Sequence, residues 1–188
     1  ERPIRLYNAG SSECFGDTGD MPATEGTPFR PRSPYAVAKA CAHNLVANYR
    51  DAYAMYACTG VLFNHESPLR PERFVTQKIV RAAARIAGGS NELLKLGNLD
   101  IHRDWGWAPD YVEAMWRMLQ QQQPDDFVIA TGRTVSLAHF VAQAFEHFGL
   151  DWRRHTQQDA CLLRPSDVRY GGADPTRARQ RLGWQASR

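Results

Sequence analysis

The sequence predicts an α/β fold in which buried parallel strands alternate with helices. Two observations carry this prediction. Short apolar runs of strand length recur along the chain, and longer amphipathic segments with helix-capping residues at their ends separate them. Hydrophobic residues make up 43% of the 188 residues, which is enough for a packed core. Only three of the apolar runs read as strands of the main sheet, which is few for a parallel sheet covered on both faces, so the sheet reads as incomplete.

The first predicted strand covers residues 4–8 and runs into the small residues 9–12. A loop rich in Gly, Thr and Pro follows it. Ser33 as N-cap and Pro34 at the first helical position then predict a helix that continues to about Tyr53. The residues expected to form its apolar stripe are Val37, Cys41, Leu45 and Val46.

The second apolar run, residues 57–63, predicts another buried strand, and the polar residues 64–68 are expected to end it. A helix is predicted from about Phe74 to Ala87, where two glycines follow. Residues 93–96 are consistent with a further short strand.

The remaining elements continue the alternation of helices and strands. Residues 109–121 predict a helix, 127–130 a strand, and Ser136 caps a helix that reaches about residue 148. Residues 174–183 predict a last helix, with Pro near its start and Gly at its end. The apolar face of the first of these helices is expected to consist of Val112, Met115, Trp116 and Leu119.

Composition excludes several classes of function. The formal net charge is only +3 and the arginines are scattered, so nucleic acid is not an expected partner. No run of about 18 apolar residues is present, so no membrane-spanning segment is expected. The four cysteines lack zinc-ligand and Cys-x-x-Cys spacings, so we expect neither a metal site nor disulfides, and a cytoplasmic location. The abrupt opening in a strand-like run suggests a natural start further upstream.

The first chemical signal is Tyr35-x-x-x-Lys39 on a predicted helix. Residues four apart share one face of a helix, so the phenol and the ammonium are expected to lie together. A phenol is a poor base at neutral pH, and a nearby ammonium favours the phenolate, which makes a tyrosine usable as a base. Taken alone, the pair is as well explained by two neighbouring surface side chains.

Ser11 and Glu13 strengthen this signal because they follow the first predicted strand. In open α/β sheets, ligands bind at the carboxyl ends of the strands. A hydroxyl there can share the proton of a substrate hydroxyl with Tyr35, and a carboxylate can move a second proton. Together with Lys39 these residues predict redox and proton-transfer chemistry.

Tyr35-x-x-x-Lys39 preceded by a strand-end serine resembles the short-chain dehydrogenase/reductase superfamily, and the addition of Glu13 resembles its sugar-nucleotide 4,6-dehydratases. Further segments are similar to the GDP-mannose 4,6-dehydratases in particular, and the similarity runs from about Ile4 to Trp184. These segments are residues 62–68, 74–78, 103–108, 126–132 and 164–165.

This resemblance implies the C-terminal part of a Rossmann-like doubly wound parallel sheet, joined to a smaller α/β substrate-binding region. Residues 1–63 and about 124–132 would be the remainder of the NADP-binding domain, from which the N-terminal strands are missing. Residues from about 64 to 123 and 133–188 would form the interleaved GDP-sugar region.

The catalytic residues that the resemblance implies are Ser11, Glu13, Tyr35 and Lys39. Tyr35 would take the proton of the mannose 4-hydroxyl while hydride moves from C4 to NADP⁺, and Lys39 would hold the nicotinamide ribose. Glu13 would remove the C5 proton, and water would leave from C6 with help from Ser11. Hydride would then return to C6, so that GDP-mannose becomes GDP-4-keto-6-deoxy-mannose.

The implied cofactor is NADP, which must stay bound through both hydride transfers. The residues implied to contact it are Tyr35, Lys39, His65 and Arg70. Family members assemble as dimers or tetramers, so a homodimer or homotetramer is expected.

The implied GDP-sugar ligands are Asn64, Lys78, Arg103 and Arg164, and Arg and Lys donors suit a pyrophosphate. Read without the family, Asn64 is equally well explained as a turn residue, and Arg103 as the partner of Asp104 in a surface ion pair. The tryptophans at 105 and 107 are expected to pack rather than to stack on substrate.

The sequence departs from the superfamily in lacking a Gly-rich phosphate loop after any strand. Residues 168–174 are also looser than the usual Gly-Asp-Pro approach to the last helix. We therefore expect the 188-residue polypeptide alone to bind NADP poorly and to be inactive, with an unpaired apolar sheet edge. Two alternatives stay open: a 4,6-dehydratase of another nucleotide sugar, and a catalytically silent nucleotide-binding scaffold protein.

Overall fold

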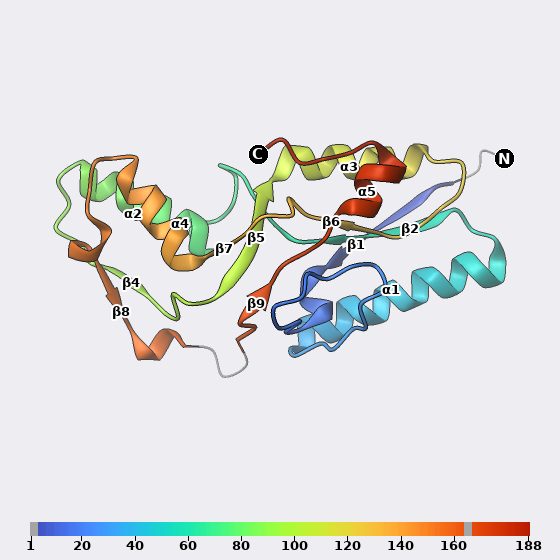
Figure 1. The fold of residues 1–188 in the computed structure, drawn as a ribbon, viewed down its shortest axis with the longest axis horizontal. Coiled ribbons are helices and arrows are strands. Elements are labelled where there is room, and N and C mark those ends of the chain that lie inside the picture. Colours follow the sequence, from blue (N-terminus) through green and yellow to red (C-terminus); the bar gives the residue numbers. More distant parts are fainter. Residues whose placement is uncertain (1–3, 164–166) are drawn as a thin grey trace.

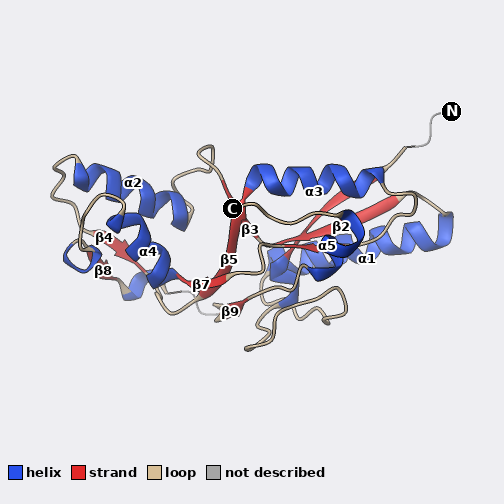
Figure 2. Cartoon of the chain, turned by 45° about the horizontal axis from the view of Figure 1, so that its top comes forward, coloured by secondary structure: helices blue, strands red, loops and turns tan. Residues whose placement is uncertain are grey.

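The computed structural model describes residues 4–163 and 167–188, which form two groups of elements joined by a central strand (Figure 1). One group holds a three-stranded sheet between helices, and the other holds two helices beside a two-stranded sheet (Figure 2). Among the described helices, none combines the length and the apolar character needed to cross a membrane.

The three-stranded sheet is parallel and has the order β1-β2-β6, from β1 (Leu6–Ser11), β2 (Ala57–Leu62) and β6 (Phe127–Ile129). The register pairs Ser11 with Leu62 and Leu62 with Ile129, so the carboxyl ends of all three strands meet at one edge. Within the described residues β1 pairs with β2 alone. β1 is therefore an edge strand in this part of the chain, and the expectation that further strands are missing stays a prediction.

Helix α1 (Pro34–Tyr53) covers one face of this sheet, and α3 (Ala108–Gln120) and α5 (Thr176–Leu182) cover the other (Figure 1). The helix start predicted for α1 is confirmed, since Ser33 accepts a hydrogen bond from Ala36 N and Pro34 is the first helical residue. The predicted stripe is wrong as a core face. The small residues Ala36 and Ala40 pack inward, whereas the stripe residues Val37, Cys41 and Leu45 are exposed.

The face predicted for α3 is also partly wrong. Val112 and Trp116 are exposed, and the buried residues are Tyr111, Ala114 and Met118. The buried face is therefore rotated by about 100°, one residue of an α-helix, from the predicted one. Apolar spacing alone could not separate the two faces, because Met115 and Leu119 at their boundary are apolar as well and pack at the rim of the core.

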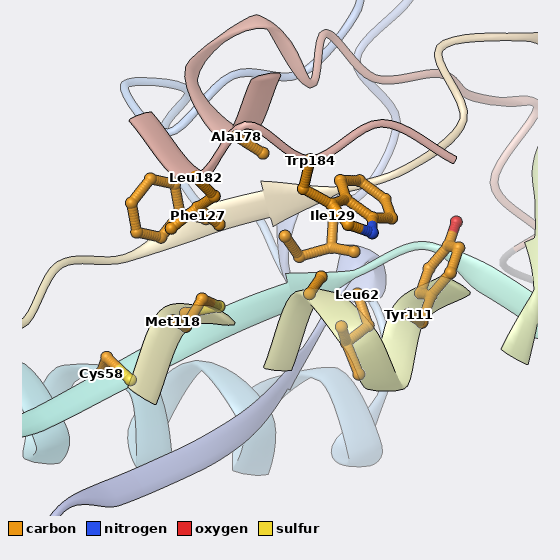
Figure 3. Packing of buried hydrophobic residues seen from close by; sticks show 10 residues of the cluster. Cys58, Leu62, Tyr111, Met118, Phe127, Ile129, Ala178, Leu182 and Trp184 are labelled. Carbon is orange, nitrogen blue, oxygen red and sulfur yellow. The ribbon is translucent and has the colours of Figure 1, made fainter. Parts of the chain in front are cut away.

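The core under α3 and α5 uses alternate residues of the strands (Figure 3). Phe127 and Ile129 face this core, whereas Val128 faces the side of α1. Trp184 is 2% exposed and its indole N–H donates to Asp110 O at 2.9 Å. Truncating a core side chain of this size costs about 3–5 kcal/mol. The cluster consists of Cys58, Leu62, Tyr111, Ala114, Met118, Phe127, Ile129, Ala178, Leu182 and Trp184.

The second group contains α2 (Val75–Ala87), α4 (Leu137–Glu146), β4 (Leu94–Leu96) and β8 (Thr156–Gln158). The two helices and the short strand near 93–96 lie where the sequence predicted them. Their buried side chains form one cluster, made of Ile79, Ala82, Ala83, Ile86, Leu94, Leu96, Leu137, Val141 and Phe145. Trp105 packs against this cluster, with its ring centroid 5.4 Å from that of Phe140, which confirms its predicted packing role.

The two groups are joined by β5 (His102–Trp107), which the sequence did not predict. It pairs with β3 (Asn64–Glu66), β7 (Thr134–Ser136) and β9 (Tyr170–Gly171). The expectation that residues 64–68 only terminate a strand is therefore wrong, because 64–66 form a strand of their own. The described part of the chain also contains three short 3₁₀ helices, at Ser12–Phe15, Trp152–Arg154 and Ala160–Leu162.

Helices α3 and α5 fall within ranges expected to form the substrate region. Their buried side chains nevertheless pack on the three-stranded sheet, in the cluster that contains Phe127. Packing therefore groups these two helices with that sheet.

Candidate functional site

The first predicted site residue, Ser11, is the last residue of β1 and the N-cap of the 3₁₀ helix that carries Glu13. Its hydroxyl accepts a hydrogen bond from Glu13 N at 3.3 Å. The preceding Gly10 permits close strand packing, since a Cβ there would lie 2.8 Å from Thr59 Cγ2. Ser11 thus stands at the carboxyl edge of the sheet, as the sequence predicted, with Glu13 immediately above it.

Tyr35 and Lys39 lie one turn apart near the start of α1. The ammonium nitrogen of Lys39 is 5.7 Å from the centroid of the Tyr35 ring and donates to Ala9 O in β1 at 2.9 Å. This contact turns the shared face of the two residues toward the end of β1. Tyr35 is 54% exposed, so its phenol is accessible to a ligand at that edge.

Glu13 has a contact that sequence reasoning missed. The hydroxyl of Ser33 lies 3.4 Å from Glu13 Oε2, across a loop that separates the two residues by 20 positions. The sulfur of the next residue, Cys14, lies 3.7 Å from the Ala36 carbonyl oxygen. Burial raises the pKa of the Cys14 thiol, so the thiol stays neutral. Cys14 is thus a packing residue rather than a nucleophile.

The loop between Glu13 and Ser33 is tied to the C-terminal part of the chain. Ala23 N donates to Gly172 O and Asp174 N donates to Ala23 O, both at 2.9 Å. Arg169 N donates to a carboxylate oxygen of Asp17 at 2.9 Å. The loop that connects Glu13 to the start of the helix bearing Tyr35 is therefore held by residues about 150 positions later.

The predicted cofactor residues lie in and after β3. The His65 ring stacks on Tyr111 with a centroid distance of 4.8 Å, and its Nδ1 is 2.9 Å from Phe63 O. Arg70 lies 3.3 Å from a Glu66 carboxylate oxygen, and its guanidinium covers the Phe74 ring at 3.8 Å. Both side chains are held in place by protein contacts, and β3 starts beside the carboxyl end of β2.

The predicted substrate residues are spread along both groups of elements. Asn64 pairs with Trp105 in register, and Lys78 donates to Lys95 O at 2.5 Å. Lys78 also lines an open groove of about 590 Å³ beside α2 and β4. Arg164 lies outside the described residues.

Arg103 donates to His102 O at 2.8 Å and contacts Asp167 at 3.4 Å. Its proposed ion pair with Asp104 is wrong, because successive side chains of a strand point to opposite faces. Asp104 is fully buried and binds elsewhere.

Asp104 is a second residue that sequence reasoning missed. One carboxylate oxygen accepts from Thr131 N and Thr131 Oγ1, both at 2.9 Å, and the other accepts from Gly132 N at 2.8 Å. Gly132 has a φ of +79°, which favours glycine at this turn. Burial raises the pKa of Asp104, and these hydrogen bonds oppose that rise. The carboxylate joins β5 to the turn after β6, and a charged residue inside an unpredicted strand was its only sequence signal.

The four predicted catalytic residues line neither the groove beside α2 nor a second cavity of about 130 Å³ that contains His43, Asp125 and Asp126. They lie at the carboxyl edge of the sheet, where Tyr35 and Glu13 are exposed. The geometry therefore supports the predicted chemistry at an open strand edge. A hydroxyl, a carboxylate, a phenol and an ammonium are gathered there from β1, the 3₁₀ helix that follows it, and α1.

Comparison with known proteins gives consistent matches. A family model described as GDP-mannose 4,6 dehydratase matches residues 1–188. GDP-mannose 4,6 dehydratase 1 of Arabidopsis thaliana is 51% identical over 184 residues, covering 98% of this chain and 51% of that protein. The human GDP-mannose 4,6 dehydratase is 45% identical over 199 residues, covering 97% of this chain and 54% of that protein. The chain thus spans about half the length of the curated relatives it matches.

Among solved structures, the dTDP-glucose 4,6-dehydratase of Bacillus anthracis in complex with NAD has a TM-score of 0.89 at 20% identity. That match covers 98% of this chain and 57% of the other. At such identity the likeness shows the fold, and it confirms the predicted Rossmann-like α/β class.

Proposed function

The chain belongs to the GDP-mannose 4,6-dehydratase family, and from this premise we propose that the whole protein converts GDP-mannose to GDP-4-keto-6-deoxy-mannose with loss of water. The observation that carries the proposal is the gathering of Ser11, Glu13, Tyr35 and Lys39 at one strand end. A reductase or an epimerase needs no base for the C5 proton, whereas Glu13 supplies one beside Tyr35. The enzyme is accordingly a hydro-lyase.

In the proposed reaction Tyr35 takes the proton of the sugar 4-hydroxyl. Lys39 lies beside this tyrosine, with its ammonium nitrogen 5.7 Å from the centroid of the Tyr35 ring. Its ammonium has three donors and gives one to Ala9 O, which leaves donors for ribose hydroxyls. The exposed phenol and this donor set fit a nicotinamide nucleoside at the edge of the sheet.

Glu13 acts in the second step. Once C4 is a ketone, the Glu13 carboxylate removes the acidified C5 proton, the C5–C6 double bond forms, and the C6 hydroxyl leaves. The proton on Glu13 combines with that hydroxide to give water, and the Ser11 hydroxyl supports this transfer. The proton that Tyr35 took from the 4-hydroxyl is returned to C5 as C6 is reduced, so the only net loss is one water.

The proposed cofactor is NADP, which when bound accepts a hydride from C4 and returns it to C6. Structures of the same fold have been solved in complex with NAD or with NADPH, which supports a nicotinamide cofactor here. We assign its contacts to Tyr35, Lys39, His65 and Arg70. Contacts with Tyr111 and Phe74 already hold the last two side chains in place.

The GDP-sugar is proposed to bind Asn64, Lys78, Arg103 and Arg164. Lys78 lines the open groove beside α2, and Arg103 lies in β5, next to the strand that starts at the carboxyl end of β2. The diphosphate would take the place of the Asp167 carboxylate beside Arg103, so Arg103 would keep an anionic partner there. The predicted homodimer or homotetramer and the cytoplasmic location stay predictions.

The proposal is tested with the protein expressed from its complete reading frame. Incubation with GDP-mannose is expected to give a product lighter by one water, detected by mass spectrometry, and Tyr35→Phe is expected to abolish it. Loss of water from a UDP- or dTDP-sugar instead would favour a dehydratase of another nucleotide sugar. Equal turnover by Tyr35→Phe would contradict the mechanism and favour the silent scaffold.

A further inference from the structure

Ser33 contacts Glu13 in addition to capping α1. Ser33 caps α1 by accepting a hydrogen bond from Ala36 N at 3.1 Å. A hydroxyl can accept and donate at the same time, so the Ser33 proton stays available as a donor. Glu13 Oε2 lies 3.4 Å away and has no proton of its own to give when ionised. Ser33 therefore donates to the carboxylate that the proposed mechanism uses as a base.

The backbone brings these two residues together independently of their side chains. Arg30 N donates to Cys14 O at 2.9 Å, which closes the loop between Glu13 and Ser33 at its base. Gly16 in this loop has a φ of +68°, and a Cβ there would overlap the Arg30 carbonyl oxygen. The close approach is thus built into the loop, and the hydroxyl and the carboxylate are placed side by side by it.

Glu13 is consequently fixed at two points. Its backbone N–H donates to the Ser11 hydroxyl at 3.3 Å, and its carboxylate accepts from Ser33. Ser33 also precedes Tyr35 by two residues and anchors the first turn of the helix that bears it. One hydroxyl thereby links the carboxylate to the tyrosine-bearing helix, although the two lie on different elements.

We propose that Ser33 is a positioning residue that aims the Glu13 carboxylate at the C5 proton of the sugar. The inference rests on the proposed function, because it assumes that Glu13 is the base of the elimination step. Its consequence is selective. Loss of the Ser33 hydroxyl slows proton removal from C5 and leaves substrate binding and the first oxidation, which use other residues, largely intact.

The chain offers a matched control in Ser136. It caps α4 with the same geometry, its hydroxyl accepting from His139 N at 3.1 Å, and its cap contact involves none of the proposed catalytic residues. Ser33→Ala and Ser136→Ala each delete one helix cap, so both are expected to lower the melting temperature by a similar, small amount, about 2–4 °C. Only Ser33→Ala removes a donor from Glu13.

The decisive experiment compares these variants in the protein expressed from its complete reading frame. Ser33→Ala is expected to lower kcat on GDP-mannose about 10- to 100-fold with KM changed by less than about twofold, since misplacing a catalytic group mainly affects the transition state. Reduced nicotinamide should accumulate during its turnover, visible by its near-ultraviolet absorbance, because oxidation at C4 outruns elimination. Ser136→Ala should show neither effect.

Two further variants separate capping from donation. Ser33→Thr keeps the cap and the donor and should restore most of the turnover. Ser33→Asp keeps the cap, since aspartate caps as well as serine, but as an anion it cannot donate, and it should be as slow as Ser33→Ala. Equal kcat for Ser33→Ala and Ser136→Ala in an active protein would overturn the inference alone. A wild-type protein that removes no water from GDP-mannose would overturn the proposed function itself.

Discussion

Replacing Asp104 with alanine removes the acceptor of three hydrogen bonds that join β5 to the turn after β6. Two of the three donors are backbone groups, Thr131 N and Gly132 N, and Asp104 is fully buried. Thr131 is half-buried and Gly132 is exposed, so water can replace part of the lost contacts; at about 0.5–1.5 kcal/mol net for each hydrogen bond, the loss of three predicts a decrease of about 1.5–4.5 kcal/mol in the free energy of unfolding. This is a large share of the stability of an ordinary domain.

Asparagine at the same position should destabilise the protein less than alanine does. Its carbonyl oxygen can still accept from Thr131, but its amide group presents N–H donors to Gly132 N. Only the hydrogen bond from Gly132 N is then lost, which predicts a decrease of about 0.5–1.5 kcal/mol in the free energy of unfolding, smaller than that for alanine. The order wild type, Asp104→Asn, Asp104→Ala follows directly from the number of acceptors that remain.

Urea unfolding followed by circular dichroism measures these differences. Asp100→Ala provides a control four residues earlier, where the side chain is exposed, and is expected to change stability by less than about 0.5 kcal/mol. If the free energy of unfolding of Asp104→Ala lay within about 1 kcal/mol of that of this control, the hydrogen bonds of Asp104 would not be what holds β5 to the turn after β6.

Three other outcomes are expected. Gly16→Ala should lower the free energy of unfolding by more than about 1 kcal/mol in the same assay, because the positive φ of Gly16 and the facing Arg30 carbonyl leave no room for a Cβ. An unchanged midpoint of urea unfolding would contradict this conformation of the loop. Burial lowers the pKa of His43, opposed by Asp126 and assisted by Arg50, so the unfolded chain binds the proton first as pH falls below the ordinary value of 6.5. The free energy of unfolding should therefore decrease as pH is lowered below 6.5, by at most about 1.4 kcal/mol per pH unit. His43→Gln should flatten this slope in urea titrations at several pH values. The 188-residue polypeptide alone should bind NADPH only weakly in fluorescence titrations, and tight, saturable binding would show that the sheet edge suffices.

Much of the fold could be predicted because its signals are local. Ser33 and Ser136 cap helices as their sequence contexts predict, and Gly183 ends α5 in a left-handed conformation. The strand containing Asp104 escaped prediction because the hydrogen-bond partners of this buried carboxylate lie far along the chain. Thr131 is one of these partners, and no period or composition in the strand reveals it.

The candidate site was likewise predicted only in part. The spacing of Tyr35 and Lys39 predicted a shared face, and the 5.7 Å between the Lys39 ammonium and the Tyr35 ring centroid confirms it. The contact between Ser33 and Glu13 depends on how the intervening loop closes, which is a tertiary property. The packing faces of α1 and α3 failed for a related reason, since alanines can form a core face when a helix approaches a sheet closely.

The ties between the loop near Ala23 and the segment near Gly172 bear on how the protein is made. During synthesis the residues around Glu13 leave the ribosome long before those around 172, so the loop has no anchor until almost all of these residues have been translated. Contacts of such long sequence separation also form late in folding. The catalytic loop is therefore among the last parts to settle, and a nascent chain that stalls before residue 169 would present Glu13 and Tyr35 without the arrangement that makes them a site.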